Sequence, residues 1–237
     1  MTDLHTHILP GMDDGAPDAD ASLALLRMEA AQGVDTVALT PHFYRDRESA
    51  ERFLARRARA VEQLRRAIEA LPEPERAALP RLIPGAETAW APGLASEPLL
   101  PQLCLGESRN LLLELPAAPW TRQMLRELYE LPGRTGLTPV FAHLERYLPG
   151  QDPRLVGELL ELGFPVQLSA APLLRPLRRG ALLRMIRSGS AQLLASDAHN
   201  AASRPPDLAP ALAVVRRRLG DETAAALDAA AARLAGL

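Results

Sequence analysis

The sequence predicts an α/β barrel, because short apolar segments alternate with helical ones and polar motifs follow most of the apolar segments. The chain has 237 residues, and we expect residues 1–237 to form a single domain, since barrels often reach this length. Hydrophobic residues make up 47% of it, enough for a sizeable core. Buried parallel strands are short and mostly apolar. Seven segments of this kind are predicted as strands: 2–4, 36–39, 81–83, 110–115, 138–141, 165–168 and 191–194.

Helical patterns fill the segments between these strands. In the second helix Leu54, Val61, Leu64 and Ile68 recur at helical spacing, which predicts one buried face. Asp20 is the expected N-cap of the first helix. The Pro-rich segments 71–80 and 115–119 are expected to be turns. The predicted helices cover residues 22–32, 48–71, 120–131, 153–162, 180–188, 208–219 and 222–234.

Composition excludes several function classes. Lys and Arg number 27 against 29 Asp and Glu, so the chain lacks the basic balance of a dedicated nucleic-acid binder. The N-terminus has no positive and apolar leader, and no 18-residue apolar run follows, so we expect a cytoplasmic protein without membrane insertion. The single cysteine, Cys104, cannot form an internal disulfide, which fits a reducing compartment.

All five histidines lie in short motifs that suit metal binding. His5 and His7 form His-Thr-His, His42 follows Thr-Pro, His143 begins His-Leu-Glu-Arg, and His199 ends Ser-Asp-Ala-His. Neutral imidazole is the commonest metal ligand. Alternate residues of a strand point to the same side, so His5 and His7 could share one metal. Each motif taken alone could be an ordinary core histidine, but five together are improbable as such.

Four carboxylates accompany the histidines. Glu114 lies in an apolar strand, where an unpaired charge costs several kcal/mol, so a metal or an arginine must neutralise it. Asp197 follows a predicted strand, and Glu87 lies in a Gly-Ala-Glu turn. Asp13 and Asp14 precede a glycine as in an ordinary turn, but they closely follow His7, so one of them could reach a metal. In barrels of this kind, the carboxyl ends of the strands converge on one face and carry the site.

The ligand set points to phosphate ester hydrolysis. Mixed imidazole and carboxylate ligands favour Mn, Fe or Zn, and about nine candidates exceed the four of a closed zinc site. Two or three clustered metals generate a hydroxide nucleophile near neutral pH and hold the oxygens of an in-line displacement. Arginines bind phosphate bidentately, and Arg146 and Arg204 follow His143 and His199 closely.

These motifs together resemble one family. Asp-Leu-His-Thr-His with the Asp-Asp-Gly that follows it, Thr-Pro-His, Gly-Ala-Glu, Leu-Glu-Leu, Ala-His-Leu-Glu-Arg-Tyr and Ser-Asp-Ala-His-Asn resemble the PHP superfamily. Within it, the Asp-Asp-Gly and the Glu-Arg-Tyr segments resemble the manganese-dependent protein-tyrosine phosphatases of the CpsB/YwqE type. The resemblance covers residues 3 to about 206. It departs at Ser203, where the family often has glycine, and in the Ala-rich C-terminal helices.

The resemblance implies a distorted seven-stranded (β/α) barrel of the PHP type with three divalent metals, manganese being favoured over iron or zinc. Arg146 and Arg204 would be catalytic residues that bind the phosphoryl group. The implied substrate is a phosphotyrosine protein, namely a tyrosine autokinase that controls capsular or exopolysaccharide synthesis. The implied ligands are His5, His7, Glu87 and Asp197 for the first metal, Glu87, Glu114 and His143 for the second, and Asp14, His42 and His199 for the third.

Other functions stay open at this point. A phosphoesterase acting on a small molecule such as histidinol phosphate, or on nucleic acid, would use the same ligands. A non-catalytic, metal-stabilised interaction protein is an alternative of another class, and an oligomer is compatible with the sequence. A cysteine phosphatase needs Cys-x5-Arg around a thiolate nucleophile. Cys104 and Arg109 are one residue too close for that loop.

Overall fold

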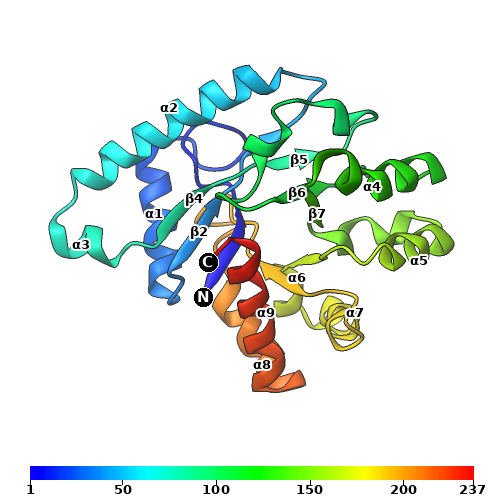
Figure 1. Ribbon diagram of the computed structural model, residues 1–237. Helices are drawn as coiled ribbons and strands as arrows, with labels where there is room; N and C mark the ends of the chain where they lie inside the picture. The colour runs from blue at the N-terminus through cyan, green and yellow to red at the C-terminus, as the bar shows by residue number, and fades with distance from the viewer.

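The computed structural model describes residues 1–237, and its strands form three parallel sheets (Figure 1). Every strand pair is parallel, and the connections between neighbouring strands run over helices. The first sheet has the order β1 (Thr2–Thr6), β2 (Thr36–Leu39), β4 (Arg81–Pro84); the second β3 (His42–Phe43), β5 (Glu87–Ala89), β6 (Asn110–Glu114), β7 (Thr138–Phe141); the third β8 (Gln167–Ser169), β9 (Leu193–Ala195).

Isolated bridges join the sheets. Thr6 pairs with Ala198, and Phe141 pairs with Val166, both in parallel. The predicted parallel α/β architecture is therefore confirmed. A closed seven-stranded barrel stays a prediction, because the strand ladders fall into three separate sheets.

Nine strands replace the seven that the sequence predicts. The two additional strands, β3 and β5, are short continuations of β2 and β4 after a break. Pro41 and Pro84 lie at these breaks, and proline has no N–H to donate to a ladder. The breaks place His42 and Glu87 in β3 and β5, where they pair in register with each other.

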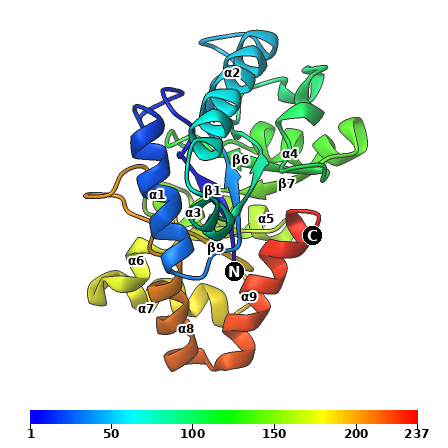
Figure 2. The same ribbon diagram turned by 90° about the vertical axis from the view of Figure 1, so that its left-hand side faces the viewer.

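Helices surround the strands (Figures 1 and 2). The longest helix is α2 (Ala50–Glu69), and its N-cap is Ser49, whose hydroxyl accepts a hydrogen bond from the N–H of Arg52. Four short 3₁₀ segments, Leu94–Ser96, Leu100–Leu103, Leu144–Arg146 and Leu148–Gly150, lie in the loops. The α-helices are α1 (Ala19–Ala31), α2 (Ala50–Glu69), α3 (Glu73–Ala78), α4 (Arg122–Thr135), α5 (Pro153–Glu161), α6 (Ala171–Leu174), α7 (Pro176–Arg187), α8 (Leu208–Leu219) and α9 (Asp221–Leu234).

Several predicted helix boundaries are wrong. Asp18, not Asp20, caps α1, because its carboxylate accepts from the N–H of Ala21. The expected turn at 71–80 contains α3, and α7 starts at Pro176 after the additional short helix α6, since proline is well tolerated in a first turn. α4 continues past the predicted end at 131 and through Pro132, then stops at Gly136, whose left-handed backbone terminates helices readily.

The core consists of two clusters of buried apolar side chains. The larger one has 46 residues and lies between the helices and the sheets. The smaller one joins Leu4, Ala38 and Leu112 of the strands to Ala230 and Ala231 of α9. Small alanine side chains let α9 pack closely against β1 and β9. The C-terminal helix therefore completes the strand core.

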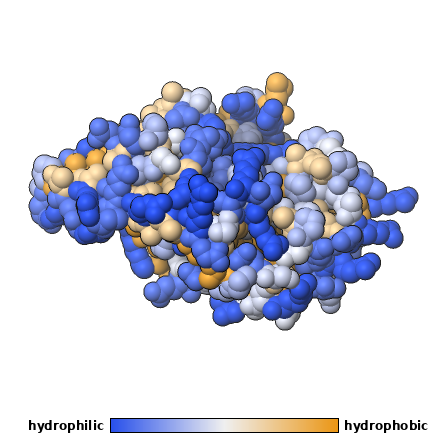
Figure 3. Space-filling model, turned by 90° about the horizontal axis from the view of Figure 1, so that it is seen from above, coloured by the Kyte–Doolittle hydropathy of each residue, from blue (hydrophilic) through white to orange (hydrophobic).

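The outer surface shows no long apolar element. No helix has both the length and the apolar composition that a membrane crossing requires. Seen from above, the space-filling surface is largely hydrophilic, and its hydrophobic patches are interrupted (Figure 3). The most exposed large apolar side chains are Leu177, Tyr129 and Leu237.

Candidate metal centre

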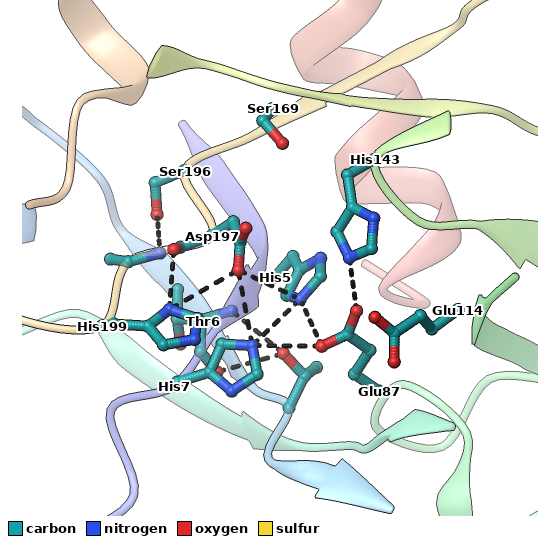
Figure 4. A network of polar contacts seen from close by, with 12 residues as sticks. His5, Thr6, His7, Glu87, Glu114, His143, Ser169, Ser196, Asp197 and His199 are labelled. Carbon is teal, nitrogen blue, oxygen red and sulfur yellow. Dashed lines mark hydrogen bonds and ion pairs between the residues drawn. The ribbon is translucent and has the colours of Figure 1, made fainter. Parts of the chain in front are cut away.

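The nine predicted metal ligands converge at one end of the strands, and Figure 4 shows most of them together. His5 and His7 lie at the end of β1, and His42 lies in β3. Glu87 and Glu114 lie in the neighbouring strands β5 and β6. The others follow strand ends or lie on a loop: Asp14 after β1, His143 after β7, and Asp197 and His199 after β9.

The first group is fully buried and tightly spaced. Nε2 of His5 lies 3.1 Å from Nε2 of His7, and Oε2 of Glu87 lies 3.1 Å from the first and 3.2 Å from the second. Oδ1 of Asp197 lies 3.5 and 3.4 Å from the same two nitrogens. Donor atoms that share an ion at roughly 2.1 Å from each lie about 3.0–3.5 Å apart. This spacing suits four ligands to one ion.

The second group joins the loop after β1 to two histidines. Oδ1 of Asp14 lies 3.5 Å from Nε2 of His42 and 3.4 Å from Nε2 of His199. Together with His7 these residues offer four ligand atoms within 4.8 Å of one another. Asp14 is 65% exposed at its side chain, so this edge of the centre faces solvent.

The third group is built around Glu87. His42, Glu87 and Glu114 offer ligand atoms within 4.8 Å, and Nε2 of His143 lies 2.5 Å from Oε1 of Glu87. One Glu87 oxygen thus faces His143, while the other faces His5, His7 and His42. A carboxylate with both oxygens directed at different ligand groups is suited to bridge two ions.

Four buried polar atoms of this cluster make no hydrogen bond within the protein: Nδ1 of His42, Oε2 of Glu87, Oδ1 of Asp197 and Nε2 of His199. Buried polar atoms are nearly always paired, because leaving one unpaired costs about 1–3 kcal/mol. All four point into the ligand groups described above. The residues therefore fit divalent ions of the Mn, Fe or Zn type.

Three further residues orient the candidate ligands, and two of them, Asp13 and Tyr147, lie in the sequence motifs. Asp13 accepts from Nδ1 of His7 at 2.8 Å. The side chain of Gln167 lies 3.0 Å from Nδ1 of His5, and its oxygen accepts the N–H of His143. The hydroxyl of Tyr147 lies 3.1 Å from Nδ1 of His143 and 3.2 Å from Oε1 of Glu114. Tyr147 lies in the Glu-Arg-Tyr motif, but its contact with two ligands is visible only in the structure.

Two candidate ligands adopt left-handed backbone conformations. His143 has φ 31° and Asp197 has φ 56°, and no other residue except glycine has a positive φ. Such a conformation is uncommon for side-chain-bearing residues and clusters at functional sites. It turns both side chains away from the strand direction and toward the ligand groups (Figure 4).

Electrostatics keeps two carboxylates of the centre, those of Glu87 and Asp197, ionised. Burial raises the pKa of Glu87, but His5, His143 and His42 outweigh it and hold that pKa well below its ordinary value. Burial also raises the pKa of Asp197. His5, His7 and Arg146 outweigh burial and hold that pKa well below its ordinary value. Burial and the neighbouring His7 lower the pKa of His199 to about 4, so its imidazole is neutral at pH 7 and can act as a ligand.

Two arginines share one oxygen of Asp197. Arg146 and Arg204 both donate to Oδ2, the latter at 2.7 Å, while Oδ1 faces the histidines. Arg204 is presented by a loop in which Oδ1 of Asn200 accepts from successive backbone N–H groups, including that of Arg204. Both guanidinium groups are partly exposed and line a cavity of about 870 Å³. They can meet an anion that approaches the centre from solvent.

Cys104 has no part in this centre. Its side chain lies in the larger apolar cluster, and burial raises the pKa of its thiol to about 11. Arg109 donates to the backbone oxygens of Gly136 and Thr135. A thiolate nucleophile in a phosphate-binding loop is therefore excluded.

Comparison with known proteins identifies the family. Residues 1–233 match the family model described as capsular polysaccharide synthesis, CpsB/CapC. The chain belongs to the CpsB/CapC family. Tyrosine-protein phosphatase YwqE of Bacillus subtilis is 30% identical over 233 residues, which cover 94% of this chain and 86% of YwqE. Tyrosine-protein phosphatase CpsB of Streptococcus pneumoniae is 27% identical over 251 residues, covering 94% and 93%.

Solved structures agree with this assignment. The CpsB/CapC chain described here superposes with a TM-score of 0.84 and 28% identity on a crystal structure from work on YwqE and CpsB as metal-dependent tyrosine phosphatases, covering 100% of this chain and 94% of the other. A Listeria monocytogenes protein proposed to be a histidinol phosphatase, at 12% identity and a TM-score of 0.51, and a mutant organophosphorus hydrolase, at 16% and 0.55, share the fold alone.

Proposed function

We propose that this CpsB/CapC protein is a metal-dependent hydrolase of phosphotyrosine on proteins. The observation that carries the proposal is the convergence of five histidines and four carboxylates beside two arginines that share Asp197. Nine ligands for adjoining ions, with cationic groups at the solvent side, suit the hydrolysis of a phosphate monoester. The relatives named as tyrosine-protein phosphatases, matched over nearly their whole length, support the choice of phosphotyrosine.

We assign the ligands to three ions, for which manganese is the expected metal and iron or zinc the alternatives. His5, His7, Glu87 and Asp197 would hold the first, and their 3.1–3.5 Å spacing supports that set. Glu87, Glu114 and His143, from the group built around Glu87, would hold the second ion, with His42 as a close neighbour. Asp14, His42 and His199 would hold the third.

The residues around the ions divide the remaining work. When bound, the ions supply a water of lowered pKa and positive charge for the phosphoryl oxygens. Arg146 and Arg204 bind the phosphoryl group and stabilise the charge that develops on it. Asp197 holds both guanidinium groups in place through Oδ2. The leaving phenolate has a pKa of about 10, so its departure requires no strong general acid.

The expected substrate is a bacterial tyrosine autokinase that regulates capsular or exopolysaccharide synthesis, and such a substrate places the enzyme in the cytoplasm. The family description supports the polysaccharide context. The arginines of α2 could be taken for a nucleic-acid surface. Arg65 and Arg66 pair with Glu62 on the same helix, however, and this pairing disfavours a nucleic-acid substrate. A non-catalytic role would leave the solvent-facing arginines beside the ligand groups without a purpose.

A substrate panel tests the proposal. The purified protein with Mn²⁺ should hydrolyse p-nitrophenyl phosphate and a phosphotyrosine peptide, and a chelator should abolish both activities. His7→Ala and Asp197→Ala should be inactive while the exposed Asp20→Ala retains activity. Turnover of histidinol phosphate or single-stranded DNA, with none on phosphotyrosine, would overturn the assignment.

A further inference from the structure

A large cavity extends the centre toward α6 and α7. It has a volume of about 870 Å³, and Arg146, Asp197 and Arg204 line it at the metal centre. Its other walls include Arg175, Arg178 and apolar residues of the two helices. Figure 2 shows the loop that carries Arg204 (orange) on the same side of the molecule as α6 and α7. The cavity therefore connects the predicted phosphoryl position with a surface outside the metal centre.

The α6–α7 wall is strongly cationic. Residues 171–187 contain five arginines and no aspartate or glutamate. Arg179 is used structurally, because it donates to the backbone oxygens of Leu173 and Leu174. Arg175 and Arg178, in contrast, make no side-chain hydrogen bond or ion pair, are exposed, and line the cavity. Unpaired cations at the rim of a cavity attract anionic groups.

Acidic side chains of the cavity do not neutralise this rim. Asp197 is already held by Arg146 and Arg204. Glu145 accepts the backbone N–H of Ser169, and Asp207 is buried, where desolvation raises its pKa to about 7. None of the three acids forms a hydrogen bond or an ion pair with Arg175 or Arg178, so these two arginines stay without a carboxylate partner.

The same cavity has apolar walls that suit a peptide. Leu148, Leu174, Leu182 and Met185 line it together with the arginines. A free phosphate or a small phosphorylated metabolite would use little of this surface, whereas an extended peptide has alternating side chains to place along it. Apolar contact and the two unpaired cations, Arg175 and Arg178, together match a peptide that carries acidic side chains near its phosphotyrosine.

We propose that this cavity binds the segment next to phosphotyrosine in the substrate, and that Arg175 and Arg178 select acidic residues there. This inference rests on the proposed phosphatase function. Two ion pairs at a partly exposed rim supply a preference of about three- to tenfold. The selection acts on binding, so it appears in KM and kcat/KM and weakens as salt is added.

Matched peptides test the inference. Two phosphotyrosine peptides carry three acidic residues, either before or after the phosphotyrosine, and their counterparts carry Asn or Gln at the same positions. The wild type with Mn²⁺ should prefer one acidic peptide over its counterpart by three- to tenfold at low salt. Arg175→Gln/Arg178→Gln should bring that ratio close to one, with kcat/KM for p-nitrophenyl phosphate unchanged. The control, Arg184→Gln/Arg187→Gln, removes two charges of α7 that do not line the cavity.

The outcomes separate this inference from the proposed function. Hydrolysis of all substrates with no acidic preference, or a preference that survives in Arg175→Gln/Arg178→Gln, overturns the peptide-binding role alone. If both double variants lose the preference for the acidic peptide equally, the preference reflects the overall charge of α7, and the peptide-binding role is again overturned. Absence of hydrolysis on p-nitrophenyl phosphate and on every phosphopeptide overturns the phosphatase function itself.

Discussion

Asp13 holds His7 by accepting a hydrogen bond from its Nδ1 at 2.8 Å. The same carboxylate oxygen accepts the backbone N–H of His42 at 2.9 Å. In the neutral imidazole, donation from Nδ1 leaves the lone pair of Nε2 free and directed at the ligand group of His5 and Glu87. Asp13 therefore positions two candidate ligands, although it lies outside the predicted ligand set.

Replacing Asp13 by alanine should weaken metal binding. Outer carboxylate partners of metal-bound histidine are worth about 10- to 100-fold in metal affinity or activity. For Asp13→Ala we expect the Mn²⁺ concentration that gives half-maximal p-nitrophenyl phosphate hydrolysis to rise by that factor. Asp20→Ala, an exposed aspartate on α1, is the control and should titrate like the wild type. An unchanged Mn²⁺ requirement in Asp13→Ala would show that His7 needs no such support.

Metal binding should also stabilise the fold measurably. A ligand at about 100 times its Kd stabilises the native state by about 2.7 kcal/mol, which corresponds to roughly 5–10 °C in Tm for a chain of this size. Chelated protein should gain this shift on addition of Mn²⁺ in a thermal melt. Glu87→Gln should lose most of the shift, because Glu87 contacts ligands in two groups. Equal shifts in both proteins would place the binding elsewhere.

The only cysteine should be dispensable for activity. Cys104 is 2% exposed and packs in the apolar core, away from the candidate ligands. Cys104→Ala should keep the wild-type kcat while losing about 1 kcal/mol of stability from the smaller side chain. Activity assays and urea unfolding of the same preparation measure both. Loss of kcat in a folded Cys104→Ala protein would contradict the metal mechanism.

A buried acid on α1 should make stability depend on pH. Glu29 is fully buried, and neither carboxylate oxygen has a hydrogen-bond partner. Burial and the neighbouring Asp3 raise the pKa of Glu29 well above its ordinary value. The unfolded chain therefore releases this proton above about pH 4.5. The folded chain retains it, so Glu29 destabilises the fold increasingly as pH rises.

Glu29→Gln removes that dependence, because an amide needs no proton to be neutral. We expect a gain in the free energy of unfolding on the order of 2 kcal/mol at pH 8 and a much smaller gain at pH 5. Urea unfolding in the presence of chelator measures it without a contribution from metal. Glu130→Gln, an exposed residue of α4, should change neither value. A gain that is equal at both pH values would mean that Glu29 binds the same number of protons in the folded and the unfolded chain, contrary to its raised pKa.

The alternation of apolar and helical segments predicted the parallel α/β architecture, because buried parallel strands have a distinct composition. The alternation did not predict β3 and β5, because two or three residues are too few to show a pattern. The pairing of these strands also depends on the breaks at Pro41 and Pro84. The alternation also missed α3 and α6, short helices in Pro-containing segments, because they too are short.

The candidate ligands were more accessible to sequence reasoning than their supports. Histidine is rare enough that five short motifs stand out, and the nine predicted ligands do lie together. Gln167 in β8 carries no such signal, because a single amide in an apolar strand has many explanations. Its contact with Nδ1 of His5 spans 162 residues and exists only in the folded chain. The proposed role of Arg175 and Arg178 could not be predicted from the sequence either, because it depends on the cavity that the fold creates.

Gly15 should be irreplaceable for a steric reason. A Cβ at this position would lie 2.0 Å from the backbone oxygen of His7 and 2.5 Å from the Cβ of His7. The clash is with backbone, so relief requires His7 or the loop of Asp13 and Asp14 to move, and a misplacement of about 1 Å can cost on the order of 100-fold in rate.

We therefore expect Gly15→Ala to lose at least 100-fold in kcat/KM and to lose most of the Mn²⁺-induced rise in Tm. Gly157 offers the matched control, because it lies inside α5 with nothing within 4 Å of an added Cβ. Gly157→Ala should keep full activity and gain about 0.5–1 kcal/mol of stability, since alanine is the better helix former. A Gly15→Ala protein with the wild-type response to Mn²⁺ would show that the loop can shift without moving its ligands.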